Sequence, residues 1–103
     1  MKKVAKIKNT KLDVKNGDIV NFWIFFDYEE SGTMGRLTLD DFAKNSEYIS
    51  ITTKKCFQIM LNLMSNLKIY NFSEMVGKRV VICGREHEGS FIPLNIFDAE
   101  NYN

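Results

Sequence analysis

Residues 18–28 read DIVNFWIFFDY, and apolar side chains dominate this stretch. Successive side chains of a β-strand point to opposite faces, so the even-numbered residues of the stretch share one face. That face is apolar throughout and consists of Val20, Phe22, Ile24, Phe26 and Tyr28. We therefore expect a strand over residues 18–28 whose even-numbered face lies in the core of the domain.

The odd-numbered face of the same strand carries Ile19, Asn21, Trp23, Phe25 and Asp27. Trp23 and Phe25 are large and apolar, but the opposite face of the strand is the one expected to lie in the core. A contiguous apolar patch on a protein surface normally marks an interface. We expect these two rings to be covered by a chain terminus, a partner subunit or a ligand.

Two further strands flank this one in the sequence. VAKIKNTKL (4–12) alternates as an exposed strand does, and the Asn-Gly pair of KNGD (15–18) favours a tight hairpin turn into residues 18–28. After the turn EESGT (29–33), the stretch MGRLTLDDF (34–42) predicts a third strand. Its inward residues are Leu37 and Leu39, and its outward residues are Arg36 and Thr38.

The second half of the chain begins with the one clear helical pattern. In TTKKCFQIMLNLMSNL (52–67), apolar residues recur at helical spacing, with a helix start near Thr52 or Thr53. The expected stripe is Cys56, Met60, Leu63 and Leu67, and the adjacent row is Phe57, Leu61 and Met64. NFSEMVG (71–77) predicts a short helical turn that begins at an Asn cap.

The last two strands are expected at KRVVICG (78–84) and SFIPLNIF (90–97), joined as a hairpin. Pro93 has no N–H to donate, so the final strand should be an edge strand or be bulged there. The order is then β-β-β-α-β-β in a single domain, residues 1–103. This predicts an α+β fold, either a curved antiparallel sheet or an OB-like partial barrel packed on one main helix.

Composition limits the function classes. No stretch approaches the roughly 18 continuous apolar residues of a membrane span, and MKKVAKIKN lacks the apolar region of a signal peptide. We expect a cytoplasmic protein without a membrane partner. Cys56 and Cys83 lie in apolar runs without nearby ligand partners, and we interpret both as reduced, buried core residues.

Catalytic and metal-binding patterns are weak. His87 is the only histidine and lies between Glu86 and Glu88, with no serine or cysteine nucleophile placed beside it. The chain is therefore interpreted as non-enzymatic, with no cofactor and no metal. Carboxylates between the second and third strands lack the ligand spacing of a calcium loop, so a solvated acidic turn is the better interpretation. These carboxylates are Asp27, Glu29, Glu30, Asp40 and Asp41.

The two glycines beside these carboxylates are too sparse for a phosphate-binding loop. Gly32 is expected to take a positive φ in the turn, and Gly35 to permit a bulge or a close approach. Charge is distributed unevenly along the chain, although the net charge is only +1. Residues 1–15 contain six lysines and one aspartate, whereas residues 16–50 contain two basic and seven acidic residues. Such polarity favours partners of opposite charge at the two regions.

The stretch FDYEESGTMGRLTLD (26–40) resembles a family of small uncharacterised proteins encoded by bacteriophages and prophages, in which an aromatic strand enters a Gly-rich turn and ends at a Leu-Asp pair. The likeness continues through Asn9 and Thr10, the helix CFQIMLNLM, residues 72–80 and the closing GSFIPLNIF. The C-terminal half is also similar to small OB-type phage single-strand-binding proteins. The likeness lies in the order of a helix, a strand that begins at Lys78 after Gly77, and a closing hairpin.

Two functions are consistent with these observations. In the first, suggested by the resemblance, the protein acts in the host cell by occluding a host protein, such as a defence effector, as anti-CRISPR proteins do. The acidic residues Asp27, Glu29, Glu30, Asp40 and Asp41 would then imitate nucleic acid, and Trp23 and Phe25 would contact the partner or a second copy in a homodimer. In the second, bases of single-stranded nucleic acid stack on Trp23 and Phe25 beside Lys6, Lys8 and Arg36.

Overall fold

The computed structural model of the chain describes residues 1–38 and 53–100, with residues 18–20 and 53–57 described by their backbone alone. Five strands in this part form one antiparallel sheet with the order β3-β2-β1-β4-β5. The strands are β1 (Lys2–Lys15), β2 (Asp18–Tyr28), β3 (Met34–Thr38), β4 (Arg79–His87) and β5 (Ser90–Asp98). The sheet and the helix α2 (Thr53–Leu67) confirm an α+β domain.

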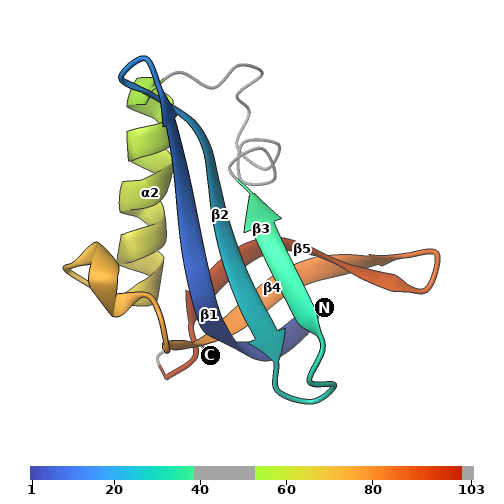
Figure 1. Ribbon diagram of the computed structural model, residues 1–103. Coiled ribbons are helices and arrows are strands. Elements are labelled where there is room, and N and C mark those ends of the chain that lie inside the picture. Colours follow the sequence, from blue (N-terminus) through green and yellow to red (C-terminus); the bar gives the residue numbers. More distant parts are fainter. Residues whose placement is uncertain (39–52, 101–103) are drawn as a thin grey trace.

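The first strand joins the two halves of the sheet. Its beginning, Lys2–Lys6, pairs with β4, and its longer part, from Ala5 to Lys15, pairs with β2. Beyond Lys6 the ladder with β4 stops, and two backbone hydrogen bonds join Ile7 to the segment before β4: the Gly77 N–H donates to the Ile7 carbonyl at 2.7 Å, and the Ile7 N–H donates to the Lys78 carbonyl at 3.0 Å. In Figure 1, β1, β2 and β3 therefore lie in front, and β4 and β5 cross behind them.

The sheet is curved enough to bring its two ends together. Although β3 and β5 stand at opposite ends of the strand order, Cα atoms of the two strands lie within 8 Å of one another. The helix α2 packs against β5 and β2, and the short 3₁₀ helix η1 (Phe72–Glu74) leads from α2 into β4. The enclosed space holds the core.

The core confirms the expected inner face of β2. Phe22, Ile24 and Phe26 have no exposed surface, and Tyr28 is 9% exposed. They pack with buried residues from each of the other strands and from α2. The partly buried Phe72 of η1 packs against this cluster. The other buried members are Ala5, Ile7, Leu37, Ile59, Leu63, Leu67, Ile69, Met75, Val80, Ile82 and Ile96.

Both hairpins turn through residues with positive φ. Asn16 (φ 54°) and Gly17 (φ 80°) join β1 to β2, and Glu88 (φ 50°) and Gly89 (φ 78°) join β4 to β5. Two consecutive positive φ values match the primed turns that suit the twist of paired strands. The expected Asn-Gly turn is confirmed, and Pro93 lies in the edge strand β5, one residue from a register shift.

The two glycines of the β2–β3 region behave as expected. Gly32 has a φ of 70°. A Cβ on Gly35 would clash with Cε2 of Phe26 and lie 2.9 Å from the Tyr28 hydroxyl, so only glycine allows these rings to pack across the neighbouring strand.

Some expectations are wrong or incomplete. Leu61 is 59% exposed, and among the helix residues whose side chains are described, Ile59, Leu63 and Leu67 are buried. Cys83 is unbridged but only partly buried, because β4 turns its even-numbered residues inward and Cys83 stands on the opposite phase. Outside the described residues lie the predicted positions Leu39, Asp40 and Asp41 and the side chains of Val20, Cys56 and Phe57.

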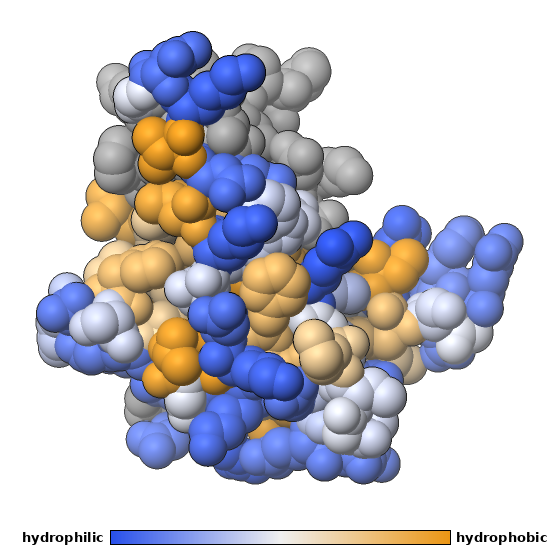
Figure 2. All heavy atoms as spheres, viewed as in Figure 1, coloured by the Kyte–Doolittle hydropathy of each residue, from blue (hydrophilic) through white to orange (hydrophobic). Residues whose placement is uncertain are grey.

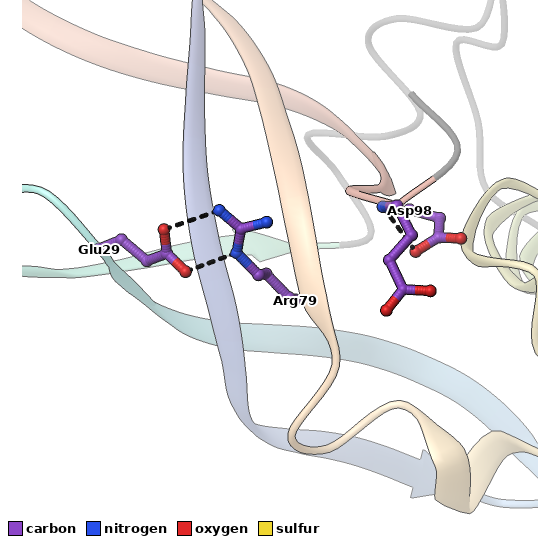
Figure 3. Close-up of polar contacts among 4 residues, drawn as sticks. Glu29, Arg79 and Asp98 are labelled. Carbon is purple, nitrogen blue, oxygen red and sulfur yellow. Dashed lines mark hydrogen bonds and ion pairs between the residues drawn. The ribbon is translucent and has the colours of Figure 1, made fainter. Parts of the chain in front are cut away.

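Two ion pairs connect the elements around the start of β4 (Figure 3). The Arg79 guanidinium donates to both carboxylate oxygens of Glu29 at 2.6 and 3.1 Å, which links β4 to the end of β2. The Lys78 ammonium lies 3.3 Å from the carboxylate of Asp98, which is 3% exposed. None of the helices in the described part of the chain has the length and apolar character needed to cross a membrane.

Candidate nucleic-acid interface

The outer face of β2 places aromatic side chains beside cations of the neighbouring strands. Trp23, Phe25 and Asp27 are partly buried there, while the residues between them are in the core. Trp23 lies opposite Lys11 of β1 and Thr38 of β3, and Phe25 lies opposite Asn9 and Arg36. Residues paired in this way point to the same side of the sheet. We call the surface formed by these residues, with Lys6, Asp27 and Met34, the outer face.

Three cations stand on the outer face. Lys6 is paired with Asp27, Arg36 with Phe25, and Lys11 with Trp23. The Lys11 ammonium lies over the Trp23 ring, 4.8 Å from its centroid. A fourth cation, Lys8, is exposed and is the extra residue of β1 at the register shift between Ile7 and Asn9.

Within the described residues these four cations form no ion pair, although Asp27 stands opposite Lys6 in the strand register. Met34, 62% exposed, extends the apolar surface beside Asp27. In Figure 2, which turns the strands β1, β2 and β3 toward the viewer, apolar groups in the middle of this side are separated by hydrophilic ones. The outer face can therefore offer stacking surface and positive charge together.

The three described residues of the expected acidic group do not form one cluster of free carboxylates. Asp27 lies on the outer face among the cations, Glu30 is exposed in the turn after β2, and Glu29 is bound to Arg79. The hydrogen bond from Arg79 is the main cause of a Glu29 pKa below its ordinary value. The three described carboxylates of the expected acidic group thus have three different environments.

A hollow lies where the β2–β3 turn meets the start of β1. It is lined by Lys2, Lys3, Val4, Tyr28, Glu29, Glu30 and Ser31. The Lys3 ammonium caps the aromatic end of the core, 5.3 Å from the Tyr28 centroid and 4.8 Å from that of Phe91. Burial raises the pKa of the Tyr28 hydroxyl. The hollow therefore holds charges of both signs, and Lys3 stands on the same phase of β1 as the buried Ala5 and Ile7.

No catalytic arrangement accompanies this surface within the described residues. His87 is exposed at the end of β4, and its Nε2 lies 3.9 Å from a carboxylate oxygen of the adjacent Glu88. No group of three or more His, Cys, Asp or Glu residues in the described ranges is arranged to hold a metal ion.

The sequence predicted Trp23, Phe25, Lys6, Lys8 and Arg36 as one binding group, and all but Lys8 are in register on the outer face. It missed Lys11. In a regular hairpin with its turn at Asn16 and Gly17, Trp23 would pair with Thr10. In the structure Thr10 pairs instead with Ile24 of the core face. A register shift between Asp13 and Val14 moves the pairing by one residue and places Lys11 opposite Trp23.

Comparison of the chain with protein-family models, with curated proteins and with solved structures found no match.

Proposed function

We propose that the protein is an OB-like domain that binds single-stranded nucleic acid on its outer face. The observation that carries the proposal is the arrangement of Trp23 and Phe25 on one side of β2, with Lys11 and Arg36 directly opposite them on the two neighbouring strands. Base stacking on aromatic rings and attraction of phosphates by cations are the two contributions such binding requires.

Strand order and curvature support the OB-like part of the proposal. An OB-fold is a five-stranded, partly open Greek-key barrel, and its strands 2 and 3 carry the face that binds oligonucleotides. Here β1 is flanked by β2 and β4, the edge strands β3 and β5 approach each other, and the helix lies between β3 and β4 in the chain. The candidate face is formed by β2 and β3 with the adjoining part of β1.

The spacing of the two rings suits an extended strand. Residues two apart on one face of a β-strand are separated by roughly 6.6–6.8 Å, about twice the base spacing of about 3.4 Å per nucleotide in a stacked strand. Trp23 and Phe25 can therefore accept consecutive bases that have separated from each other, as in aromatic stacking by sheet surfaces that bind single strands. A duplex keeps its bases stacked and paired and cannot use the rings in this way.

The distribution of acidic residues favours this function over occlusion of a host protein by nucleic-acid imitation. Imitation needs a continuous acidic surface. Among the described residues Glu29 is engaged by Arg79, and Asp27 stands opposite Lys6. The side of the domain that carries Trp23 and Phe25 also carries Lys11 and Arg36, neither of which forms an ion pair among the described residues.

The test is a fluorescence anisotropy titration of labelled oligothymidine with the purified protein, repeated with a duplex of equal length and at several salt concentrations. We expect at least tenfold tighter binding to the single strand. The logarithm of the association constant should fall with the logarithm of salt concentration by about 0.7 per phosphate contact. Absence of binding, or equal affinity for the duplex, contradicts the proposal.

Three variants locate the site. Loss of a stacking partner costs about 1–3 kcal/mol per base, so Trp23→Ala and Phe25→Ala should each weaken binding by about fivefold or more. Tyr70→Ala is the matched control, because Tyr70 is an aromatic residue that is 97% exposed and lies beyond the end of α2. Equal losses in all three variants would indicate that stacking is not localised on β2.

A further inference from the structure

We infer that Lys11 is an exchangeable cap on Trp23: its ammonium covers the ring in the free protein and moves to a phosphate when a base takes its place. The inference rests on the proposed function and adds a residue that controls access to the stacking site. It starts from the position of the Lys11 ammonium, 4.8 Å from the centroid of the Trp23 ring.

The contact is a cation–π interaction between residues directly opposite each other on β1 and β2. A cation within about 6 Å of an aromatic centroid is attracted to the ring face, most strongly for tryptophan. A base that stacks on the same face must displace the ammonium. The cap therefore competes with the ligand for Trp23.

The displaced ammonium has a second role available. Lys11 is exposed and forms no ion pair with any residue in the described ranges, and its side chain is long and flexible. A base stacked on Trp23 brings its own phosphate close to the neighbouring strand, where the released ammonium can neutralise it. Lys11 thus opposes base stacking on Trp23 and favours binding of the nucleic-acid phosphate. Salt mainly weakens the attraction between the ammonium and the phosphate.

Phe25 provides a natural comparison within the same face. Its partner on β1 is the uncharged Asn9, and no cation–π contact involves Phe25 among the described residues. Among the described residues, a cation lies over the ring at Trp23 and none lies over that at Phe25. The inference therefore applies to Trp23 alone.

The salt dependence of binding separates the two roles. We choose Lys11→Thr, because threonine suits a strand and carries no cation, and compare it with the wild-type protein in the oligothymidine titration. Removal of one phosphate contact should reduce the salt slope by about 0.7. Removal of the cap should by itself contribute a gain in affinity of about two- to fivefold that changes little with salt, and at low salt the lost phosphate contact should outweigh this gain. The two plots of affinity against salt should therefore cross, with the variant weaker at low salt and tighter at high salt.

Lys8→Thr is the matched control, because it removes a lysine from the same strand that has no contact with an aromatic ring among those described. Its affinity should stay at or below that of the wild-type protein at all salt concentrations. The second readout is collisional quenching of Trp23, the only tryptophan of the chain, by neutral acrylamide in the free protein. Lys11→Thr should raise the quenching constant, and Lys8→Thr should leave it unchanged.

Each result has a distinct meaning. Crossing plots with increased quenching support the cap. Plots for Lys11→Thr that converge without crossing, or that run parallel to the wild type, overturn the cap while leaving single-strand binding intact. Unchanged quenching in the free Lys11→Thr variant also overturns it. If the wild-type protein binds no oligothymidine at all, the proposed function fails and the cap fails with it.

Discussion

The two faces of β2 carry aromatic side chains at alternate positions, but their surroundings differ in almost every respect. Phe22 and Phe26 are completely buried among aliphatic and aromatic neighbours, whereas Trp23 and Phe25 are partly exposed and stand opposite Lys11 and Arg36. Hydrophobicity alone does not distinguish these residues. Their phase along the strand, together with the charge on the adjacent strands, separates residues that stabilise the fold from residues available to a ligand.

The largest effect is expected from removal of an inner aromatic side chain. Phe26→Ala should lower the free energy of unfolding by about 3–5 kcal/mol, measured by urea denaturation. Trp23→Ala changes a residue on the outer face of the same strand, and it should lower the free energy of unfolding by about 1 kcal/mol or less. The same variant should lose most of its affinity for oligothymidine. If Phe26→Ala leaves too little folded protein, Ile24→Val should still cost about 0.5–1.5 kcal/mol. Equal destabilisation by Phe26→Ala and Trp23→Ala would remove the distinction between the faces.

The next effect concerns the space above Gly35. Gly35→Ala places a methyl group against the Phe26 and Tyr28 rings, and overpacking of this kind costs about 1–3 kcal/mol. The control is Gly32→Ala, where no atom of the described residues lies within 4 Å of the added Cβ and the cost arises from the positive φ. Adding Phe26→Leu, which removes the ring, should recover part of the stability lost in Gly35→Ala. The same addition should recover none of the stability lost in Gly32→Ala. Full stability of the single Gly35→Ala variant would show that the inner face is not closely packed.

The smallest effect is a pH dependence at the rim of the outer face. The folded-state pKa of Glu29 lies below its ordinary value, chiefly because of the hydrogen bond from Arg79. The stability that this pair contributes is therefore complete above the unfolded-state pKa, near 4.5, and is lost as the pH falls through the lower folded-state pKa. The melting temperature of Glu29→Gln should lie below that of the wild-type protein at pH 7.

The same difference in melting temperature should shrink as the pH is lowered from 4.5 toward 2.5. Both side chains of the pair are substantially exposed, so the difference at pH 7 should be small. Glu30→Gln removes a charge from the same turn without affecting Arg79 and is the control. A difference between wild type and Glu29→Gln that remains constant across this range would contradict the stabilising role of the pair.

Local pattern was sufficient to predict most of the fold. The bounds of β2, its inner face, the Asn16-Gly17 turn and the element order depend on alternation and turn chemistry, which act between near neighbours. Two errors have the same physical origin. The buried side of a helix or strand depends on what packs against it, so Leu61 and Cys83, apolar within apolar runs, were placed in a core that does not reach them.

The candidate site was predictable in its residue types but not in its register. Trp23 and Phe25 follow from the phase of β2 alone. The partners on β1 depend on two bulges, at Asp13/Val14 and Ile7/Asn9, and each moves the pairing by one residue. Neither bulge has a glycine or proline signal in the sequence, so Lys11 could be assigned to Trp23 only from the paired strands.

The central claim is that the outer face of β2 holds the nucleic acid, and the intrinsic fluorescence of Trp23 tests it most directly. Because the chain has one tryptophan, any change in indole emission arises at the proposed site. We predict that oligothymidine quenches this emission saturably, with the same midpoint as the anisotropy titration, and that added salt restores it. Emission that stays unchanged while anisotropy reports saturation, or the absence of any binding, would contradict the claim.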